Sequence, residues 1–483
     1  MAQNYRLQDR GRVDLERPID FTYNGKRYRG YAGDTVASAL LANGVHLVGR
    51  SFKYHRPRGI LGAGAEEPNA LLQVESGART LPNVRATQAE LYDGMSVTSV
   101  NAWPGPETDV GAVNQLFSKL FPAGFYYKTF MWPAKAWPTY EKVIRHAAGL
   151  GKAPTQADPD FYDKRYAHCD VLVAGGGPSG LAAALTAARS GARVILADEN
   201  PEFGGSLLSS RETIDGKPAM DWVAATLEEL RQHPEVRILP RTIVFGYYDH
   251  NWIDLLESRT DHLSQKPDDR PRQRMWKVRA QEVVLATGAI ERPLVFVDND
   301  RPGILLASAA RTYVNRYGVK PGNRCVLVTN NDGAYQAALD MQDAGIEIAA
   351  AIDIRAEATG PFTEKAKQAG IRILANHGVA GVEGAKRVRA IKAQPLAGDG
   401  ESLTGSAEKI ACDVVANSGG WNPTVHLFSQ SRGKLRFEPE TAAFVPDKSV
   451  QRERSAGSCQ GTWGLQGCLK DGLAAGAEAA KAA

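Results

Sequence analysis

The spacing of hydrophobic and polar positions changes near residue 170 of the chain. Before that point, short runs with β-type character (IDFTYNG, KRYRGYAG, LLQVES) surround one helical segment at Thr35 to Asn43. The Asn-Gly pair at 24–25 has the composition of a tight hairpin turn between the first two runs. These features predict a small α+β domain within residues 1–100.

Residues 101–165 show weak periodicity and are rich in Pro, Trp and Tyr. We interpret them as a connecting, partner-facing segment. The aromatic run from Phe121 to Trp137 is interrupted by prolines and lysines, so we expect it to pack into a core or a partner rather than into lipid.

From Asp170 onward, apolar strands alternate with helices, which is typical of an α/β parallel sheet with helices on its faces. DVLVAGGG, SGLAAALTAARSG and ARVILADE form one strand-helix-strand unit, and RCVLVTNN, DGAYQAALDMQDAG and IEIAAAID form a second. EVVLATGA is a strand between them, and Lys470 to Ala480 is a closing helix. The order predicts one Rossmann-like domain, at 166–297 and 405–483, interrupted by another at 298–404.

The first unit contains a G-x-G-x-x-G motif at Gly175, Gly177 and Gly180, directly after a strand and at the start of a helix. Gly175 permits the tight turn, Gly177 lets a pyrophosphate approach the backbone, and Gly180 allows close helix–strand packing. The positive end of the helix, at Pro178 and Ser179, favours phosphate. We therefore expect a dinucleotide here.

An acid about 20 residues after the motif commonly holds the ribose hydroxyls. Asp198 fills this place, with Glu199 beside it, and a carboxylate there favours NAD or FAD over NADP. Further candidates for cofactor contact lie in PEFGGSLL, in the strand TIVFG and at the end of EVVLATGA. These candidates are Gly204, Gly205, Val244, Thr287 and Gly288. For Val244, Thr287 and Gly288, in the last two of these segments, a packing role is nearly as good an explanation.

The turn of the second unit reads VTNNDGAY, with Asn330, Asn331 and Asp332 where a phosphate-binding turn would have glycines. Side chains would crowd a phosphate and Asp332 would repel it. We therefore predict a degenerate second nucleotide-binding fold.

Composition limits the other possibilities. The formal net charge of +4 is slight for 483 residues and argues against a nucleic-acid binder. We expect the basic run from Arg50 to Arg58 to be a solvated or subunit-facing loop. The five cysteines form no C-x-x-C pair, so no zinc site is indicated, and we expect reduced thiols. No apolar leader or membrane-spanning stretch occurs, which predicts a cytoplasmic location and no membrane partner.

The ATG strand, the PEFGG turn and the interrupted double domain resemble the thioredoxin-reductase-like flavoproteins. RSFKYHRPRG, DVLVAGGGPSGLAAA, ADENPEFGG, EVVLATGAIERPLVF and AGSCQGTWGLQGCLKDG resemble, more specifically, the α subunit of heterotetrameric sarcosine oxidase. This resemblance runs from about Arg17 to Ala480.

Three departures accompany this resemblance. Related amine-oxidising subunits have a ferredoxin-like first domain with four cluster cysteines, whereas GILGAGAEEPNALLQ has none and no cysteine precedes Cys169. We expect a ferredoxin-like scaffold without a cluster. Ala456-Gly457-Ser458 replaces the A-G-D segment that contacts flavin, which favours NAD. The chain ends at Ala483, before an aminomethyltransferase-like domain, so we expect a shortened form or a folate function on another polypeptide.

The resemblance implies that sarcosine is oxidised at FAD in a β subunit and that electrons pass through FMN near the α–β interface to oxygen. This chain would then supply an NAD site and part of that interface, within a hetero-oligomer that contains smaller subunits as well. We assign no catalytic residue and interpret His55, His168 and His426 as structural. Three alternatives stay open: an FAD-dependent NAD(P)H oxidoreductase, a subunit of a related amine or opine dehydrogenase, and a structural or regulatory NAD-binding subunit without enzymatic activity.

Overall fold

A computed structural model of the chain describes residues 3–118, 124, 132–149 and 151–483. These residues divide into two compact units, one formed by residues 1–159 and 293–419 and the other by 160–292 and 420–483. Each unit is therefore assembled from two separate stretches of the chain; the order of strands predicted such a division for the first Rossmann-like domain alone.

The first stretch of unit 1 is a five-stranded sheet in the order β2-β1-β7-β5-β6, packed around one short helix. The turn at Asn24 and Gly25, both with positive φ, brings Tyr23 opposite Lys26 and confirms the expected hairpin. The elements are β1 (Asp14–Tyr23), β2 (Lys26–Ala32), α1 (Val36–Ala42), β3 (Gly49–Arg50), β4 (Pro57–Arg58), β5 (Leu71–Val74), β6 (Leu81–Arg85) and β7 (Ser96–Ser99).

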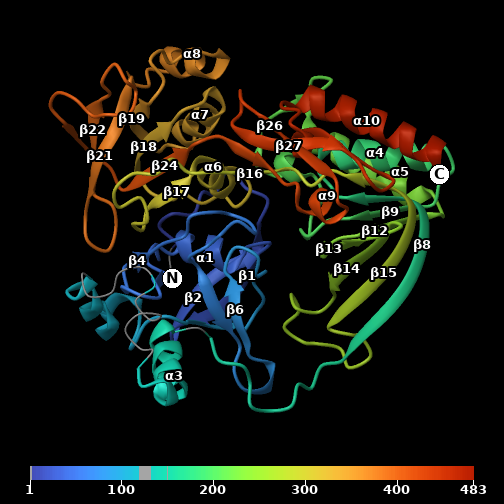
Figure 1. Ribbon diagram of the computed structural model, residues 1–483, viewed down its shortest axis with the longest axis horizontal. Helices are drawn as coiled ribbons and strands as arrows, with labels where there is room; N and C mark the ends of the chain where they lie inside the picture. Colours follow the sequence, from blue (N-terminus) through green and yellow to red (C-terminus); the bar gives the residue numbers. More distant parts are fainter. Residues whose placement is uncertain (1–2, 119–123, 125–131, 150) are drawn as a thin grey trace. The chain divides into compact units, whose positions relative to one another are not determined.

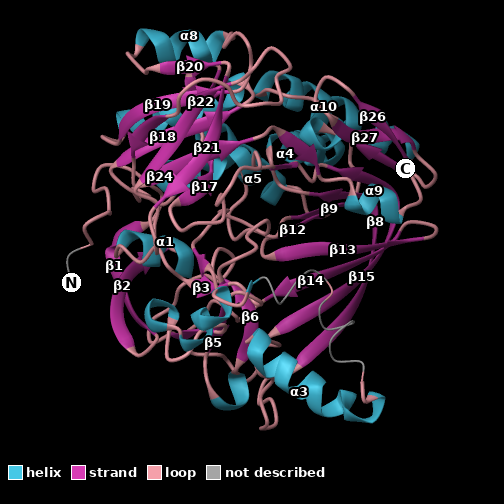
Figure 2. Cartoon of the chain, turned by 60° about the vertical axis from the view of Figure 1, so that its left-hand side comes forward, coloured by secondary structure: helices cyan, strands magenta, loops and turns pink. Residues whose placement is uncertain are grey.

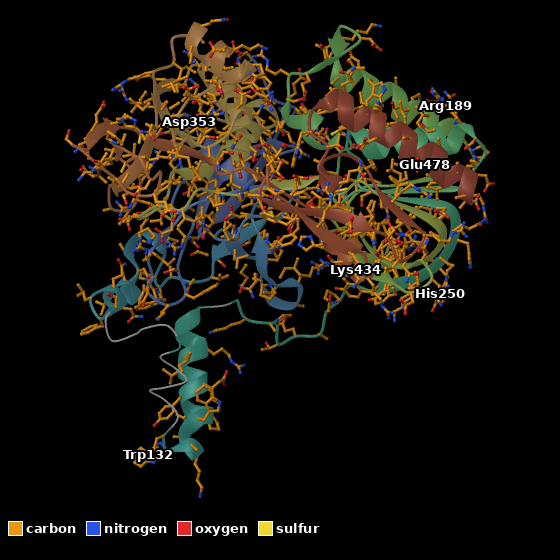
Figure 3. The ribbon with its side chains drawn as sticks, turned by 45° about the horizontal axis from the view of Figure 1, so that its top comes forward. Trp132, Arg189, His250, Asp353, Lys434 and Glu478 are labelled. Carbon is orange, nitrogen blue, oxygen red and sulfur yellow. The ribbon has the colours of Figure 1, made fainter. Side chains whose placement is uncertain are left out.

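After β7, the described residues that precede α3 (Trp137–Ala148) include short 3-10 helices at Pro106–Thr108, Val110–Gln115 and Ala134–Ala136. Most of the aromatic run from Phe121 to Trp137 lies outside the described residues. Trp132, which is described, is 85% exposed and extends away from the chain at the end of this segment (Figure 3).

The second stretch of unit 1 has a parallel sheet in the order β17-β24-β18-β19-β20 and a smaller antiparallel sheet, β21-β22-β23. One hydrophobic core joins residues of this stretch, such as Tyr313 and Tyr335, to Phe21 and Leu72 of the first. The elements are β17 (Ile304–Leu306), α6 (Ala307–Asn315), β18 (Arg324–Thr329), α7 (Tyr335–Asp343), β19 (Glu347–Asp353), α8 (Pro361–Gln368), β20 (Ile373–Ala375), β21 (His377–Glu383), β22 (Ala390–Pro395), β23 (Glu408–Ala411) and β24 (Val414–Ser418).

Unit 2 is built on a seven-stranded sheet in the order β12-β9-β8-β15-β14-β13, with β28 paired to β15. The long strands β8, β15, β14 and β13 lie side by side (Figure 2), and helix α10 runs along α4 (Figure 1). The elements are β8 (Tyr162–Ala174), α4 (Pro178–Arg189), β9 (Val194–Ala197), α5 (Ala219–Gln232), β12 (Val236–Leu239), β13 (Thr242–Tyr248), β14 (Trp252–Ser258), β15 (Gln273–Leu285), β16 (Ala289–Glu291), β25 (Trp421–Pro423), α9 (His426–Gln430), β26 (Lys434–Glu438), β27 (Ala443–Lys448), β28 (Glu453–Ser455) and α10 (Leu465–Ala482).

Four expected boundaries need correction. Residues 162–165 are part of β8 rather than of the connecting segment, and α10 begins at Leu465, not Lys470. Residues 405–419 do not return to the first Rossmann-like domain, because β24 pairs with β17 and β18 in the second one. The chain crosses at 292–293 and 419–420, so the expected crossing points at 298 and 405 are wrong.

The expectation of a solvated basic loop is also wrong for Arg50 and His55, which are buried. Arg50 donates to the carbonyl of Pro106, and His55 Nδ1 lies 2.6 Å from Asp109. Arg56 and Arg58 form ion pairs with Asp298 and Asp300 of the same unit. These basic side chains thus hold unit 1 together.

Candidate nucleotide site and related proteins

The glycine-rich turn follows β8 at the edge where parallel strands β8, β9 and β15 all end. Gly175 has φ +106°, a region that favours glycine, and its N–H donates to the carbonyl of Ala197 at 2.9 Å. A Cβ on Gly175 would lie 2.3 Å from the oxygen of Ala286, so a side chain would push β8 and β15 apart. Both the positive φ and the close approach of β15 therefore favour a glycine here.

The other glycines of the turn have different surroundings. A Cβ on Gly180 would lie 1.8 Å from the Gly175 oxygen, so this glycine lets α4 pack against the turn. A Cβ on Gly177 would meet nothing closer than the Gly205 Cα at 3.8 Å. The space beside Gly177 is open, as the approach of a phosphate requires.

The N-terminus of α4 is available to an anion through its backbone. No side chain caps this end, and the N-cap residue is Gly177. Pro178 has no N–H, so the free donors of the first turn begin with Ser179 and Gly180. The Ser179 side chain is buried toward Gly457, where an added Cβ would lie 2.1 Å from the Ser179 Oγ. Ser179 can therefore contribute its N–H but not its hydroxyl.

Asp198 lies beside the turn, but both of its carboxylate oxygens are already used. Oδ2 accepts from the Gly176 N–H at 2.6 Å, and Oδ1 accepts from the N–H and the side-chain amide of Asn200 at 2.8 and 3.0 Å. Asp198 is 9% exposed, whereas Glu199 is an exposed residue. The arrangement makes Asp198 a brace for the glycine turn and leaves Glu199 as the solvent-facing acid at this strand end.

A second glycine turn packs against the first. Gly204 donates to the Gly176 carbonyl at 2.8 Å, and Gly204 and Gly205 both have positive φ. A Cβ on Gly205 would lie 2.7 Å from the Gly177 Cα. The PEFGG segment therefore completes a cradle whose two walls are backbone.

The remaining candidates lie at different distances from this cradle. Thr287 follows β15 beside Gly175, and its hydroxyl donates to the Thr424 carbonyl at 2.7 Å, while Gly288 accepts from the Thr424 N–H at 2.9 Å. Val244 lies further along, on β13, and is partly buried against the core beneath the sheet. The structure brings Thr287 and Gly288 to the turn; for Val244 it shows a packing contact.

Sequence reasoning missed the part played by the closing helix. Cβ atoms on Gly472 and Gly476 would lie 2.2 Å from the Ser179 oxygen and 2.4 Å from the Ala183 oxygen, so α10 packs directly on the backbone of α4. Asp471 accepts from the Gly457 N–H at 3.3 Å, which ties the Ala456-Gly457-Ser458 segment to α10. The four-residue spacing of Gly472 and Gly476 was the available signal.

The corresponding turn of the second Rossmann-like domain is filled by its own side chains. Asp332 accepts from the N–H and hydroxyl of Thr363, both at 2.7 Å, and Asn331 accepts from the Ala334 N–H. Asp353, at the end of β19, is fully buried and bonded to Tyr335 and Arg355 (Figure 3). Asp332 and Asp353 thus bond to side chains and backbone of their own domain. That this domain no longer binds a nucleotide stays a prediction.

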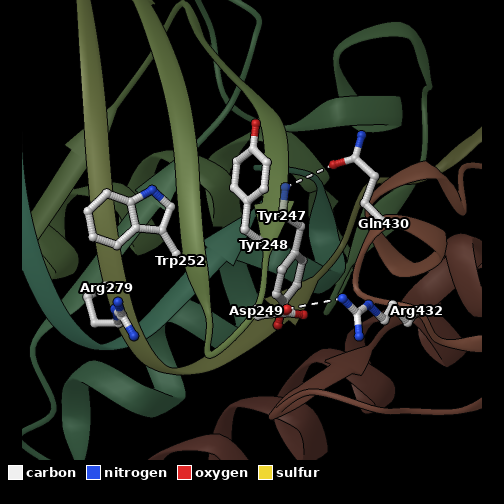
Figure 4. Close-up of a pocket in the computed structure, with 7 residues that line it drawn as sticks. All are labelled: Tyr247, Tyr248, Asp249, Trp252, Arg279, Gln430 and Arg432. Carbon is white, nitrogen blue, oxygen red and sulfur yellow. Dashed lines mark hydrogen bonds and ion pairs between the residues drawn. The ribbon is translucent and has the colours of Figure 1, made fainter.

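A separate hollow of about 470 Å³ lies on unit 2 near the end of the β13–β14 hairpin (Figure 4). Asp249 pairs with Arg432 at 3.1 Å, and Gln430 accepts from the Tyr247 N–H at 2.9 Å. None of the residues of the nucleotide cradle lines this hollow.

All five cysteines are free, and burial raises the pKa of the Cys169 and Cys412 thiols to about 12. Among the described residues, no group of three or more His, Cys, Asp or Glu side chains is arranged to hold a metal ion. No helix within the described ranges is long and apolar enough to cross a membrane.

Two protein-family models match parts of the chain. Residues 16–102 match a 2Fe-2S iron-sulfur cluster binding domain, and residues 170–245 match an FAD dependent oxidoreductase. The second match covers β8, the glycine turn, α4 and the PEFGG segment, so the cradle belongs to a dinucleotide-binding oxidoreductase fold.

Similar proteins cover nearly the whole chain. The sarcosine oxidase subunit alpha of Rhizobium meliloti (strain 1021) is 50% identical over 98% of this chain and 46% of its own length. The sarcosine oxidase subunit alpha of Corynebacterium sp. (strain P-1) is 39% identical over 100% of this chain and 46% of its own length. L-proline dehydrogenase from P. horikoshii is 19% identical with a TM-score of 0.65 over 99% of this chain and 75% of its own, which shows a shared fold. In sequence, the chain is similar to the alpha subunits of sarcosine oxidase over nearly its whole length, and it spans about half the length of these relatives.

Proposed function

We propose that this chain is the nucleotide-binding part of a multi-subunit sarcosine oxidase and holds NAD in the cradle of unit 2. The observation that carries this proposal is 50% identity to a sarcosine oxidase subunit alpha over 98% of the chain. The cradle supports it, because no atom would lie closer than 3.8 Å to a Cβ on Gly177, and Gly205 packs its backbone against this turn without a side chain in the way.

The choice of NAD rests on the acid and on the C-terminal segment. Glu199 is exposed at the end of β9, where a carboxylate would bond ribose hydroxyls and repel a 2′-phosphate. Ser458 stands where flavoproteins of this fold have a carboxylate, and the neighbouring Gly457 N–H is bonded to Asp471. NAD held here would be a structural or regulatory ligand, since the proposed amine oxidation takes place at a flavin on another subunit.

The reaction proposed for the assembled enzyme is the oxidation of the N-methyl group of sarcosine. The products are glycine, peroxide and formaldehyde or a folate-bound one-carbon unit. The partner would be a flavin-bearing β subunit with FAD, and FMN would lie at its interface with this chain. We expect this chain to be inactive alone and to contribute binding surfaces rather than a group that touches the amine.

A second candidate is FAD in the same cradle, because the matching family model for residues 170–245 describes FAD dependent oxidoreductases. A self-sufficient NAD(P)H oxidoreductase would also need a nicotinamide site on the second Rossmann-like domain. Asp332, Asn331 and Asp353 are bonded internally there, which favours the first candidate.

The test is to purify the chain, record its absorption spectrum and identify the released nucleotide by mass. We expect a colourless protein with NAD, and sarcosine-dependent peroxide only after the flavin-bearing subunit is added. A yellow chain with one FAD would transfer the proposal to the second candidate. NAD without any peroxide from the complete assembly would leave a purely structural or regulatory NAD-binding subunit.

A further inference from the structure

The fold of the first domain implies a cofactor that its residues do not fit. Residues 16–102 match a 2Fe-2S cluster binding domain, and such clusters are held by cysteine thiolates. No cysteine precedes Cys169 in the sequence. The loop of residues 60–70 lies within the segment GILGAGAEEPNALLQ. Something other than a cluster must therefore hold this loop in place.

Glu67 is at the centre of this loop. Its Oε2 accepts from the N–H groups of Leu61 and Gly62, both at 2.7 Å. Its Oε1 accepts from the N–H groups of Asn69 and Ala70 at 2.7 and 2.9 Å. Glu67 is only 1% exposed, so one buried carboxylate satisfies four backbone donors from both sides of the loop.

Glu66 completes the arrangement. Its Oε1 accepts from the N–H groups of Ala63 and Gly64 at 2.7 and 2.9 Å. Two adjacent carboxylates thus accept from six backbone N–H groups between Leu61 and Ala70. Converging backbone N–H groups form anion-binding nests, and iron-sulfur sites are among the places where such nests occur.

We propose that the carboxylates of Glu67 and Glu66 take the place of an anionic iron-sulfur cluster and that the loop folds around them. A buried carboxylate with four donors is stable only because each hydrogen bond offsets the cost of removing its charge from water. Burial raises the pKa of Glu67, and the N–H donors of Gly62, Ala70, Asn69 and Leu61 oppose this shift.

The loop held in this way joins the two parts of unit 1. The Leu61 carbonyl accepts from the Leu306 N–H at 2.8 Å, and the Gly62 carbonyl accepts from the Tyr313 hydroxyl at 2.9 Å. Tyr313 is fully buried on α6. In domains of this fold that bear a cluster, the loop would serve electron transfer. Here the same loop connects the first domain to the second Rossmann-like domain through hydrogen bonds.

The first test uses the unmodified protein. The whole chain is incubated anaerobically with iron and sulfide, desalted, and analysed for bound iron and acid-labile sulfide. We expect neither above a protein-free blank, and unchanged thermal unfolding when a chelator is present. Stoichiometric iron and sulfide in the desalted protein would overturn the proposal.

The second test measures hydrogen exchange of the four amides bonded to Glu67. We expect these loop amides to be protected in the wild type and to exchange about tenfold faster or more in Glu67→Gln, the equivalent of one lost hydrogen bond. Glutamine keeps the shape but turns an N–H₂ group toward two of the donors. Asp399→Asn is the matched control, because Asp399 accepts from two backbone N–H groups in an exposed turn.

If Glu67→Gln does not fold, the proposal is tested by the exchange rates of the wild type and by Glu66→Gln, which affects two backbone hydrogen bonds instead of four. Unprotected amides at Leu61 and Gly62 in the wild type, or rates in Glu67→Gln equal to those of the wild type, would contradict the proposal. The nucleotide cradle lies in unit 2, so its nucleotide content reports separately on the proposed function.

Discussion

Gly177 and Gly180 differ in what a side chain would meet at each position. At Gly180 a Cβ would lie 1.8 Å from a backbone oxygen, whereas at Gly177 the nearest atom is 3.8 Å away. Of these two glycines, Gly180 is thus required by the close packing of the helix on the turn, whereas packing does not require a glycine at position 177, where we propose that a ligand does. The motif contains glycines for two separate reasons, which mutation can distinguish.

Gly177→Ala should leave the protein folded but weaken nucleotide binding by about tenfold or more, equivalent to about 1.4 kcal/mol. The added methyl group would occupy space that a phosphate needs, and its nearest protein atom would be the Gly205 Cα at an unstrained 3.8 Å. Nucleotide content and calorimetric affinity measure the effect, alongside the melting temperature. Gly398→Ala, where a Cβ meets nothing within 4 Å, is the control. Equal affinities in both variants would argue against a phosphate at this turn.

Substitutions of Asp198 and Glu199 should likewise have different effects, one mainly on stability and the other mainly on nucleotide binding. Asp198→Asn weakens the brace on the Gly176 N–H, so we expect a loss of about 1–3 kcal/mol in the free energy of unfolding. Glu199→Gln, at an exposed position, should cost less stability than Asp198→Asn and reduce affinity for NAD, because it removes a charged acceptor for ribose hydroxyls. Denaturant titration and NAD binding on both variants test this. An unchanged affinity in Glu199→Gln would remove Glu199 from the proposed site.

Among the secondary structure elements, helices α4 and α10 depend on each other. Figure 3 shows Arg189 of α4 and Glu478 of α10 on these neighbouring helices. Gly472 and Gly476 let the two backbones approach, so the end of the chain supports the helix whose N-terminus forms the cradle. Small residues spaced by four on one helix face permit such close packing.

Gly476→Ala should destabilise unit 2 by about 1–3 kcal/mol, because its Cβ would lie 2.4 Å from the Ala183 oxygen and the helices must move apart. The loss is measured by urea unfolding, followed by nucleotide content at low temperature. Ala474→Ser adds an atom on the exposed side of α10 and serves as the control. A Gly476→Ala protein as stable as this control would show that the helices are less closely packed.

At the scale of the whole molecule, separate stretches of chain in unit 1 are joined by partly buried ion pairs as well as by a shared core. Asp300 accepts from Arg56 at two positions, both at 2.8 Å, and also bonds Arg58. Burial alone would raise the pKa of Asp300, but hydrogen bonds from Arg56 and Arg58 outweigh it and lower the pKa. The ionised form is therefore the one that stabilises unit 1.

Because the folded-state pKa of Asp300 is lowered, its contribution is present above the unfolded value of about 3.9 and is lost as pH falls through the folded-state pKa. Asp300→Asn should cost about 1–3 kcal/mol at neutral pH and flatten the loss of stability below about pH 4. Urea unfolding between neutral and acidic pH measures both. Asp249→Asn, which breaks the exposed pair with Arg432, should change stability by less than about 1 kcal/mol. Parallel pH profiles for wild type and Asp300→Asn would contradict this role.

Local signals in the sequence were sufficient for most elements. The Asn-Gly turn, the helix at residues 36–42 and the strand-turn-helix around Gly175 depend on neighbouring residues and lie where the pattern predicts. The point at which the chain passes from unit 1 to unit 2, at 419–420, could not be predicted from neighbouring residues. The strand before it, β24, has the same apolar pattern whichever parallel sheet it joins. Its assignment depends on pairing with β18, a contact distant in sequence.

The sequence by itself determined that a glycine-rich turn of the nucleotide-binding type follows β8, since glycine spacing, helix start and strand are all local. It also excluded a cysteine-bound cluster in the first domain. Only the tertiary structure decided that Asp198 faces inward while Glu199 faces solvent, since adjacent residues on a strand end point to opposite sides. It alone showed Glu67 within the cluster loop, because four backbone donors converge on one carboxylate only when the loop is folded.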